Sequence, residues 1–196
     1  LELEQTLPDI LKNPKANGRK ALEKRWHRWM KLTPCVVSTF FMLPSYLKGS
    51  KYNGSGYDDD YMYELIDLLI VDEAGQVLPE VAGASFALAK KALVIGDTLQ
   101  IEPIWSIPDS VDIGNLMSAG LLPRVGVDQA YETLCATGVS AASGSVMRIA
   151  QNASRYHYDL DMDRGMFLYE HRRCYNSIVD YCNALCYRGK LVPVRG

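Results

Sequence analysis

Two short apolar runs that end in acidic residues constrain the fold of this chain more than any other feature. Residues 68–71 precede the pair Asp72-Glu73, and about 20 residues later residues 92–95 precede Gly96-Asp97. The Ala-rich segment between them, residues 77–91, is compatible with a helix. Two strands joined by a helix form a β-α-β unit, so the pattern predicts two buried, parallel strands with a right-handed crossover.

The carboxyl ends of parallel strands meet at one edge of the sheet, where open α/β folds bind their ligands. Asp72 is therefore placed to hold Mg²⁺, and the adjacent Glu73 to orient or deprotonate a water molecule. Acidic residues after a strand also begin ordinary surface turns, and the pair alone does not separate the two interpretations.

The wider sequence context favours the functional interpretation. Residues 69–76 (Leu-Ile-Val-Asp-Glu-Ala-Gly-Gln) and 93–103 (Leu-Val-Ile-Gly-Asp-Thr-Leu-Gln-Ile-Glu-Pro) resemble motifs II and III of the superfamily 1 DNA and RNA helicases. Residues 170–191, with Arg173 and a Tyr-x-Gly-x-Leu tail that begins at Tyr187, resemble motif IV. Residues 33–39 resemble the strand-and-threonine segment that lies along the nucleic-acid channel of these enzymes.

This resemblance implies an α/β fold. It would be part of a RecA-like P-loop NTPase, a parallel sheet with flanking helices, followed by the start of a second RecA-like lobe. Residues 1–33 would then form an N-terminal helical segment, residues 34–164 part of the first lobe, and residues 165–196 the start of the second.

The resemblance also implies catalytic roles for three residues. Glu73 would activate the attacking water. Gln100 would contact the γ-phosphate and link hydrolysis to the nucleic-acid channel. Arg173 would stabilise charge on the transferred phosphoryl group, as an arginine finger does. The spacing back from Tyr187 favours Arg173 over the neighbouring Arg172 as the arginine of motif IV.

The same resemblance implies binding roles for other residues. Asp72 would hold Mg²⁺, through water, Gln76 would sense the nucleotide, and Asp97 would fix its loop. The implied substrate is ATP with Mg²⁺, and the implied partner is single-stranded DNA or RNA. Residues expected to approach the nucleic acid are Ser38, Thr39 and Trp105.

No segment of the chain matches a phosphate loop with its Gly-Lys-Ser/Thr. In the helicase interpretation this Walker A loop is expected before residue 1, and motifs V and VI after residue 196, in the remainder of a longer parent chain. Since the loop supplies the main contacts to the β- and γ-phosphates, the 196 residues alone are predicted neither to bind ATP tightly nor to hydrolyse it.

Two alternatives remain open at this point. The chain could be a non-catalytic, helicase-like module that binds nucleic acid or protein. It could also be a Mg²⁺-dependent nuclease that uses Asp72, Glu73 and Asp97, although no lysine closely follows either strand.

Composition narrows the class of protein. With 48% apolar and 22% charged residues, the chain can bury a core, and no apolar run approaches the length of a membrane span. The net charge of −2 hides an asymmetry of +4 over residues 1–33, −10 over 34–163 and +4 over 164–196. Five irregularly spaced cysteines, together with a start of the given sequence in which no signal peptide is visible, predict a cytoplasmic protein.

Local patterns predict the remaining elements. Helices are expected over 19–32, 128–136, 145–156 and 177–187, and strands over 35–40 and 165–169. Surface loops are expected over 48–60 and 103–128. A further helical stretch is expected before the break at Pro14, Asn17 and Gly18.

Overall fold

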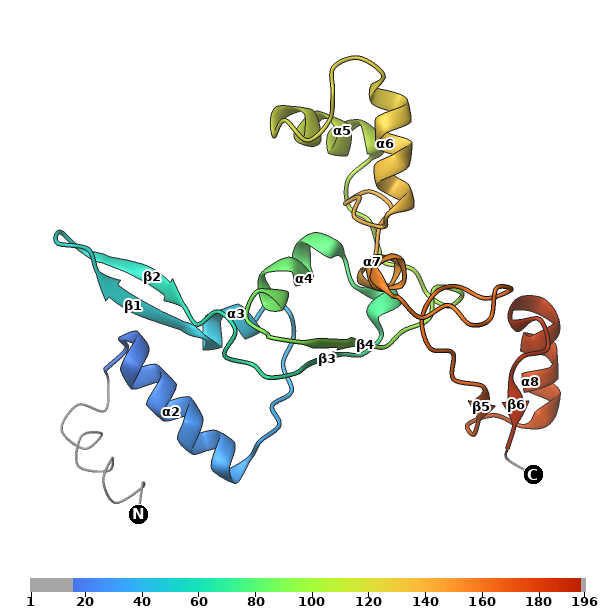
Figure 1. Cartoon of the computed structure of the whole chain (residues 1–196), viewed down its shortest axis with the longest axis horizontal. Helices are drawn as coiled ribbons and strands as arrows, with labels where there is room; N and C mark the ends of the chain where they lie inside the picture. The colour runs from blue at the N-terminus through green and yellow to red at the C-terminus, as the bar shows by residue number, and fades with distance from the viewer. Residues whose placement is uncertain (1–15, 195–196) are drawn as a thin grey trace. The chain divides into compact units, whose positions relative to one another are not determined.

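The computed structural model describes residues 16–194 and contains both helices and strands (Figure 1). Within that range it has seven α-helices, and its strands form sheets of two strands each. The chain divides into two compact units. Unit 1 comprises the residues up to 72 together with 78–95, and unit 2 comprises 73–77 together with the residues from 96 onward. The division into segments 1–33, 34–164 and 165–196 stays a prediction, and the helical stretch expected before Pro14 lies outside the described residues.

Unit 1 has a small core on the apolar stripe of helix α2 (Arg19–Leu32). Leu22 of this stripe packs with Leu47, Met62 and Leu88, and Trp26 covers the cluster. The helix ends at Leu32, and Thr33, directly before Pro34, leaves the helical conformation as expected, because the residue before a proline is disfavoured in the α region. The predicted helix over 19–32 is confirmed.

The prediction of a surface loop over residues 48–60 is wrong, since these residues form an antiparallel hairpin (Figure 1). Strand β1 (Lys48–Tyr52) pairs with β2 (Tyr57–Tyr61). The Asn53 side chain accepts hydrogen bonds from the backbone N–H groups of Ser55 and Gly56, and Gly54 adopts a φ of +100°. The glycines and Asn53 therefore build a turn, and the tyrosines that flank it pack across the strands with ring centroids 5.4 Å apart.

The strand expected over residues 35–40 is also wrong. Residues 33–39 form no regular element, and Val37 is 95% exposed. The chain turns at residues 40–42 and continues into the short helix α3 (Leu43–Tyr46). β-Branched residues favour a strand only where another strand pairs with them, and none of the strands within residues 16–194 pairs with this segment.

The β-α-β unit is present in unit 1. Strands β3 (Leu69–Val71) and β4 (Ala92–Val94) pair in parallel, with Ile70 opposite Leu93, and helix α4 (Pro79–Phe86) lies in the connection between them. Pro79 opens α4 at a position where the missing N–H costs nothing. The parallel pairing is confirmed at nearly the predicted bounds.

The two strands are less buried than expected. Val71 is buried, but Ile70 is 57% exposed and Leu93 is 49% exposed. A sheet of two strands covers little of its own surface, so a continuous apolar run does not guarantee burial. The α/β class is confirmed as a mixture of helices and small sheets, whereas a RecA-like sheet stays a prediction.

Unit 2 is mainly helical, with α5 (Asp109–Ser118), α6 (Val127–Ala136), α7 (Val146–Ala153) and α8 (Asn176–Cys182). After α8 the chain forms a π-helical turn, η2 (Asn183–Tyr187), so the predicted helix over 177–187 is confirmed with a change of winding. A short parallel pair joins β5 (Glu170–His171) to β6 (Val192–Pro193) beside α8 (Figure 1). The strand expected over 165–169 is wrong, because these residues form no strand and β5 begins only at Glu170.

Helix α5 replaces part of the loop expected over 103–128. Pro108 precedes it, and Asp109 and Asp112 lie in its first turn, where acidic side chains favour the positive end of the helix dipole. Asp112 is buried and accepts hydrogen bonds from the hydroxyls of Tyr131 and Ser140 at 3.1 and 2.8 Å, which fixes α5 against α6.

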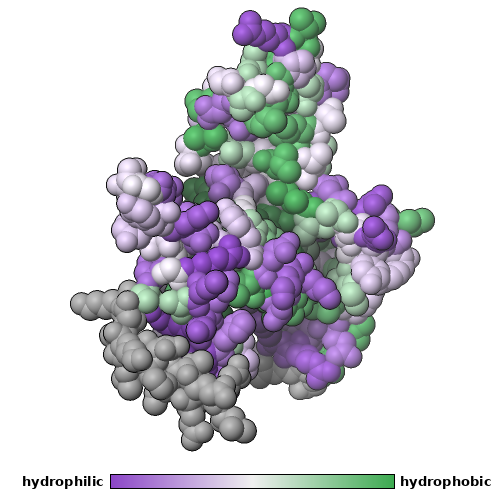
Figure 2. All heavy atoms as spheres, turned by 60° about the vertical axis from the view of Figure 1, so that its left-hand side comes forward, coloured by the Kyte–Doolittle hydropathy of each residue, from purple (hydrophilic) through white to green (hydrophobic). Residues whose placement is uncertain are grey.

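The surface combines polar and apolar residues. Hydrophilic and hydrophobic residues are interspersed over the face in Figure 2, and the connection between α5 and α6 exposes Leu121 and Val125. Among the described helices, none combines the length and the apolar character that crossing a membrane requires.

Candidate functional site

The turns that follow β3 and β4 are packed against each other in unit 2. A Cβ on Gly75 would lie 2.5 Å from the carbonyl oxygen of Asp97, and a Cβ on Gly96 would lie 2.8 Å from the backbone nitrogens of Ala74 and Gly75. Both distances are far shorter than a real contact, so only glycines permit this approach. The two glycines bring residues 73–77 and 96–100 together.

The first of these turns is the short 3₁₀ helix η1 (Ala74–Gln76), which Glu73 precedes. Glu73 has a φ of 52°, in the left-handed region that residues other than glycine rarely adopt. Gln76 Nε2 donates a hydrogen bond to Glu73 Oε2 at 3.4 Å, and both side chains are exposed. Two of the predicted site residues therefore lie together on an accessible turn with an unusual backbone.

The second turn is organised by the carboxylate of Asp97. Its Oδ1 accepts the backbone N–H of Leu99 at 2.8 Å, and its Oδ2 accepts Gln100 Nε2 at 2.9 Å. The hydroxyl of Tyr187 donates to the same Oδ2 at 2.5 Å. The structure thus joins Asp97 and Gln100 directly, and the role of Asp97 in the proposed site stays a prediction.

Tyr187 belongs to this group, although sequence reasoning gave it no role. Burial, together with the hydrogen bond to the Asp97 carboxylate, raises the pKa of Tyr187 to about 12. A tyrosine hydroxyl is protonated at neutral pH in any case, and the raised pKa extends its capacity to donate to more alkaline pH. Its place in the Tyr-x-Gly-x-Leu tail was the available signal, but a pattern alone does not show which loop a tyrosine contacts.

Asp72 follows β3 directly and has an exposed side chain. Over residues 16–194, no group of three or more His, Cys, Asp or Glu side chains could hold a metal ion. Mg²⁺ in phosphoryl-transfer enzymes is held by one or two carboxylates together with phosphate oxygens, so a cage of protein ligands is not required. Binding of Mg²⁺ by Asp72 stays a prediction.

Arg172 and Arg173 lie in the turn between β5 and α8. The guanidinium of Arg172 donates two hydrogen bonds to Oε2 of Glu170, at 2.5 and 3.2 Å, and is therefore engaged locally. Arg173 is exposed in the same turn. His171 accepts the backbone N–H of Cys174 through Nε2, which shapes this turn.

The residues expected to approach nucleic acid have structural contacts of their own. Ser38 and Thr39 lie in the irregular segment of unit 1, where the Ser38 hydroxyl donates to the carbonyl of Thr39. Trp105 is half-buried in unit 2, and its indole N–H donates to the carbonyl of Gly144 at 3.0 Å. Nucleic-acid contact by these residues stays a prediction.

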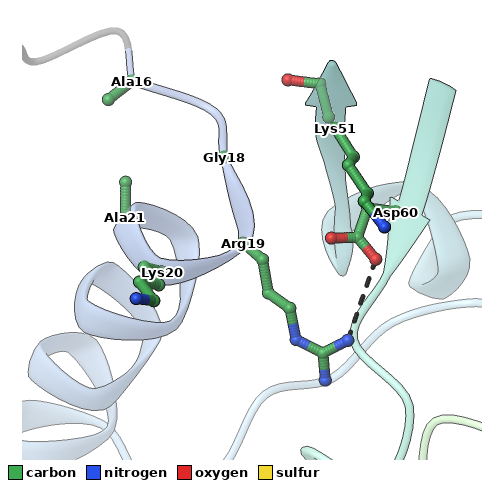
Figure 3. Close-up of a pocket in the computed structure, with 8 residues that line it drawn as sticks. Ala16, Gly18, Arg19, Lys20, Ala21, Lys51 and Asp60 are labelled. Atoms are coloured by element: carbon green, nitrogen blue, oxygen red, sulfur yellow. Dashed lines mark ion pairs between the residues drawn. The ribbon is translucent and has the colours of Figure 1, made fainter. Parts of the chain in front are cut away.

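A separate hollow lies on the surface of unit 1, between the start of α2 and the hairpin (Figure 3). Arg19, Lys20, Lys51 and Asp60 line it, and an ion pair joins Arg19 to Asp60 over 3.8 Å. None of the predicted site residues belongs to its lining.

The close approach at Gly75 gives a stability prediction. Gly75→Ala is expected to destabilise the chain by about 1–3 kcal/mol, because the new methyl group would overlap a backbone carbonyl that cannot move aside freely. Gly83→Ala, in the exposed part of α4 with open space around it, is expected to stabilise by about 0.5–1 kcal/mol. Thermal unfolding followed by circular dichroism checks both, and equal melting temperatures for the two variants would contradict the packing of the turns.

Comparison of this chain with models of protein families, with curated proteins and with solved structures gave no match.

Proposed function

We propose that this chain carries the catalytic turns of an ATP-driven motor that moves along or unwinds nucleic acid, similar to the superfamily 1 helicases. The observation that supports this most is the mutual packing of the two turns through Gly75 and Gly96. It brings the Glu73–Gln76 pair and the Asp97–Gln100 pair into neighbouring turns, at the carboxyl ends of two parallel strands.

The proposed division of labour follows from the chemistry of each side chain. Asp72 would hold Mg²⁺ through water, which neutralises charge on the phosphates. Glu73, an exposed carboxylate next in sequence, would position the attacking water and take its proton. Gln76 is a neutral donor and acceptor, suited to contact the nucleotide.

The second turn and the basic turn complete the proposed site. Gln100 would contact the γ-phosphate, with its amide held by Asp97. Arg173 would supply positive charge to the transferred phosphoryl group, and the spacing back from Tyr187 favours Arg173 over Arg172 for this role. Coupling of these contacts to single-stranded DNA or RNA would make hydrolysis a source of movement.

The test is ATP hydrolysis by a protein that combines these residues with a phosphate loop, measured with and without single-stranded DNA or RNA. Stimulation by either nucleic acid is the expected result. Nucleic-acid binding without any hydrolysis would instead support the non-catalytic module. Cleavage of the nucleic acid that depends on Mg²⁺ but not on ATP would support the nuclease.

The 196-residue chain on its own gives a second prediction. Because no Gly-Lys-Ser/Thr loop is present to hold the β- and γ-phosphates, calorimetric titration with Mg-ATP is expected to show no binding in the micromolar range. Micromolar affinity would show that residues other than a phosphate loop hold the nucleotide, and the proposed roles would then be wrong.

A further inference from the structure

The π-helical turn η2 places Tyr187 on a rigid support. Asn183, buried at the start of this turn, donates through Nδ2 to the carbonyl of Leu191 and accepts the N–H of Leu191 through Oδ1, both at 2.8 Å. The carbonyl of Asn183 also accepts the N–H of Gly189. Asn183 therefore closes residues 183–191 into a fixed loop, and Tyr187 lies at the end of its helical part. π-Helical turns are rare and often occur at functional sites.

The contacts of Tyr187 divide between its ring and its hydroxyl. The ring is half-buried and lies beside Phe167, with centroids 6.4 Å apart. The hydroxyl donates to Asp97 Oδ2 at 2.5 Å, and Gln100 Nε2 lies 3.5 Å from the hydroxyl oxygen. A hydrogen bond to a carboxylate is about twice as strong as one between neutral groups. Removing the hydroxyl alone therefore separates the polar contact from the packing.

The Asp97 carboxylate uses both of its oxygens within this group. Oδ1 holds the backbone of the turn through Leu99, and Oδ2 holds the side chain of Gln100. The hydroxyl of Tyr187, 90 positions away in the sequence, fixes the carboxylate from the other side. Without that donor, the Asp97 carboxylate would keep only the contacts to Leu99 and Gln100, which both come from its own turn.

A second set of contacts supports the same connection. Arg188 Nη1 donates to the carbonyl of Asp161, and Lys190 pairs with Asp159, each at 2.6 Å. On the other side, the hydroxyl of Thr98 donates to Asp163 at 3.3 Å. Residues 159–163 thus bridge the residues after Tyr187 to the turn that carries Asp97.

We infer that Tyr187 is a positioning residue, whose hydroxyl fixes the Asp97–Gln100 pair and connects it to the segment that follows Arg173. Its effect on hydrolysis rests on the proposed function, whereas its effect on the geometry of the turn does not. The two parts are tested by separate measurements.

The kinetic test compares Tyr187→Phe with Tyr181→Phe in the protein that combines these residues with a phosphate loop. Tyr187→Phe keeps the ring and its packing, so its melting temperature is expected to stay within a few degrees of that of the wild type. The expected result is a kcat about tenfold lower with an unchanged KM for ATP, the effect of about 1.4 kcal/mol on the transition state. Tyr181, exposed on α8, is the matched control, and its variant is expected to keep the wild-type kcat. Equal kcat values for the two variants would overturn the positioning role.

The structural test uses the 196-residue chain and needs no ATP hydrolysis. The amide of Leu99 reports on the Asp97 carboxylate, so its hydrogen exchange, followed by NMR, is expected to accelerate about tenfold in Tyr187→Phe. The amide of Ile95, bonded to Val71 in unit 1, is the internal reference and is expected to keep its rate.

The two measurements separate the hypotheses. If the wild-type protein hydrolyses no ATP, the proposed function fails, and exchange at Leu99 still decides whether Tyr187 positions the turn. If exchange at Leu99 is unchanged in Tyr187→Phe, the positioning role fails even where hydrolysis is observed.

Discussion

Replacing Arg173 by Ala is expected to lower nucleic-acid-stimulated ATP turnover by about 10³–10⁵-fold, the range found when an arginine finger is lost. The proposed reason is that the guanidinium stabilises charge that develops only in the transition state. ATP affinity is therefore expected to change much less than kcat. Steady-state kinetics together with equilibrium nucleotide binding measure the two effects.

Arg172→Ala is the matched control, because it removes the same charge one residue away. Arg172 is not the arginine proposed to contact the phosphoryl group, so its loss is expected to change turnover only slightly. Arg173→Lys separates charge from shape, since lysine keeps the charge but lacks the planar fork of donors. A larger loss in Arg172→Ala than in Arg173→Ala would show that the catalytic arginine was assigned wrongly.

Replacing Glu73 by Gln is the second change with a large expected effect. The amide keeps the size of the side chain but cannot accept a proton, so turnover is expected to fall by about 10²–10⁴-fold. ATP binding is expected to persist, because Glu73 is proposed to act on the attacking water. Single-turnover hydrolysis, with nucleotide binding measured in parallel, checks both.

Glu80→Gln provides the control for Glu73. Glu80 is an exposed glutamate in the first turn of α4, and its neutralisation removes the same charge without touching the turn after β3. It is expected to keep the wild-type turnover. Unchanged hydrolysis in Glu73→Gln would refute the assignment of Glu73 as the base.

The sequence was most informative where structure depends on near neighbours. The amphipathic stripe of residues 19–32 and the two apolar runs predicted α2, β3 and β4 close to their observed bounds. The parallel pairing of the two strands was also correct, because the helical segment between them excludes a tight hairpin.

Prediction failed where pairing or burial decides the outcome. Residues 35–40 have the composition of a strand but no partner, whereas residues 48–61 form a hairpin despite their glycines and acidic residues. Tyr52 and Tyr57, which pack across that hairpin, were the available signal. The extent of burial of β3 and β4 depends on how many strands join the sheet, which no local pattern gives.

In the candidate site too, contacts between near neighbours were predictable from the sequence and contacts between distant residues were not. Short motifs predicted six candidate site residues, namely Asp72, Glu73, Gln76, Asp97, Gln100 and Arg173. Two hydrogen bonds among them join side chains that are three positions apart in the sequence. The contact of Tyr187 with Asp97 spans 90 positions, and the packing of Gly75 on Asp97 depends on backbone geometry. Both required the structure.

The most direct test of the proposed nucleotide site is a crystal structure of a form of the protein that carries a phosphate loop, with Mg²⁺ and a non-hydrolysable ATP analogue bound. The γ-phosphate is expected within hydrogen-bond reach of Gln100, roughly 2.6–3.2 Å, with Mg²⁺ near Asp72 and a water beside Glu73. A nucleotide bound elsewhere, with the turns after β3 and β4 both remote from its phosphates, would contradict the account.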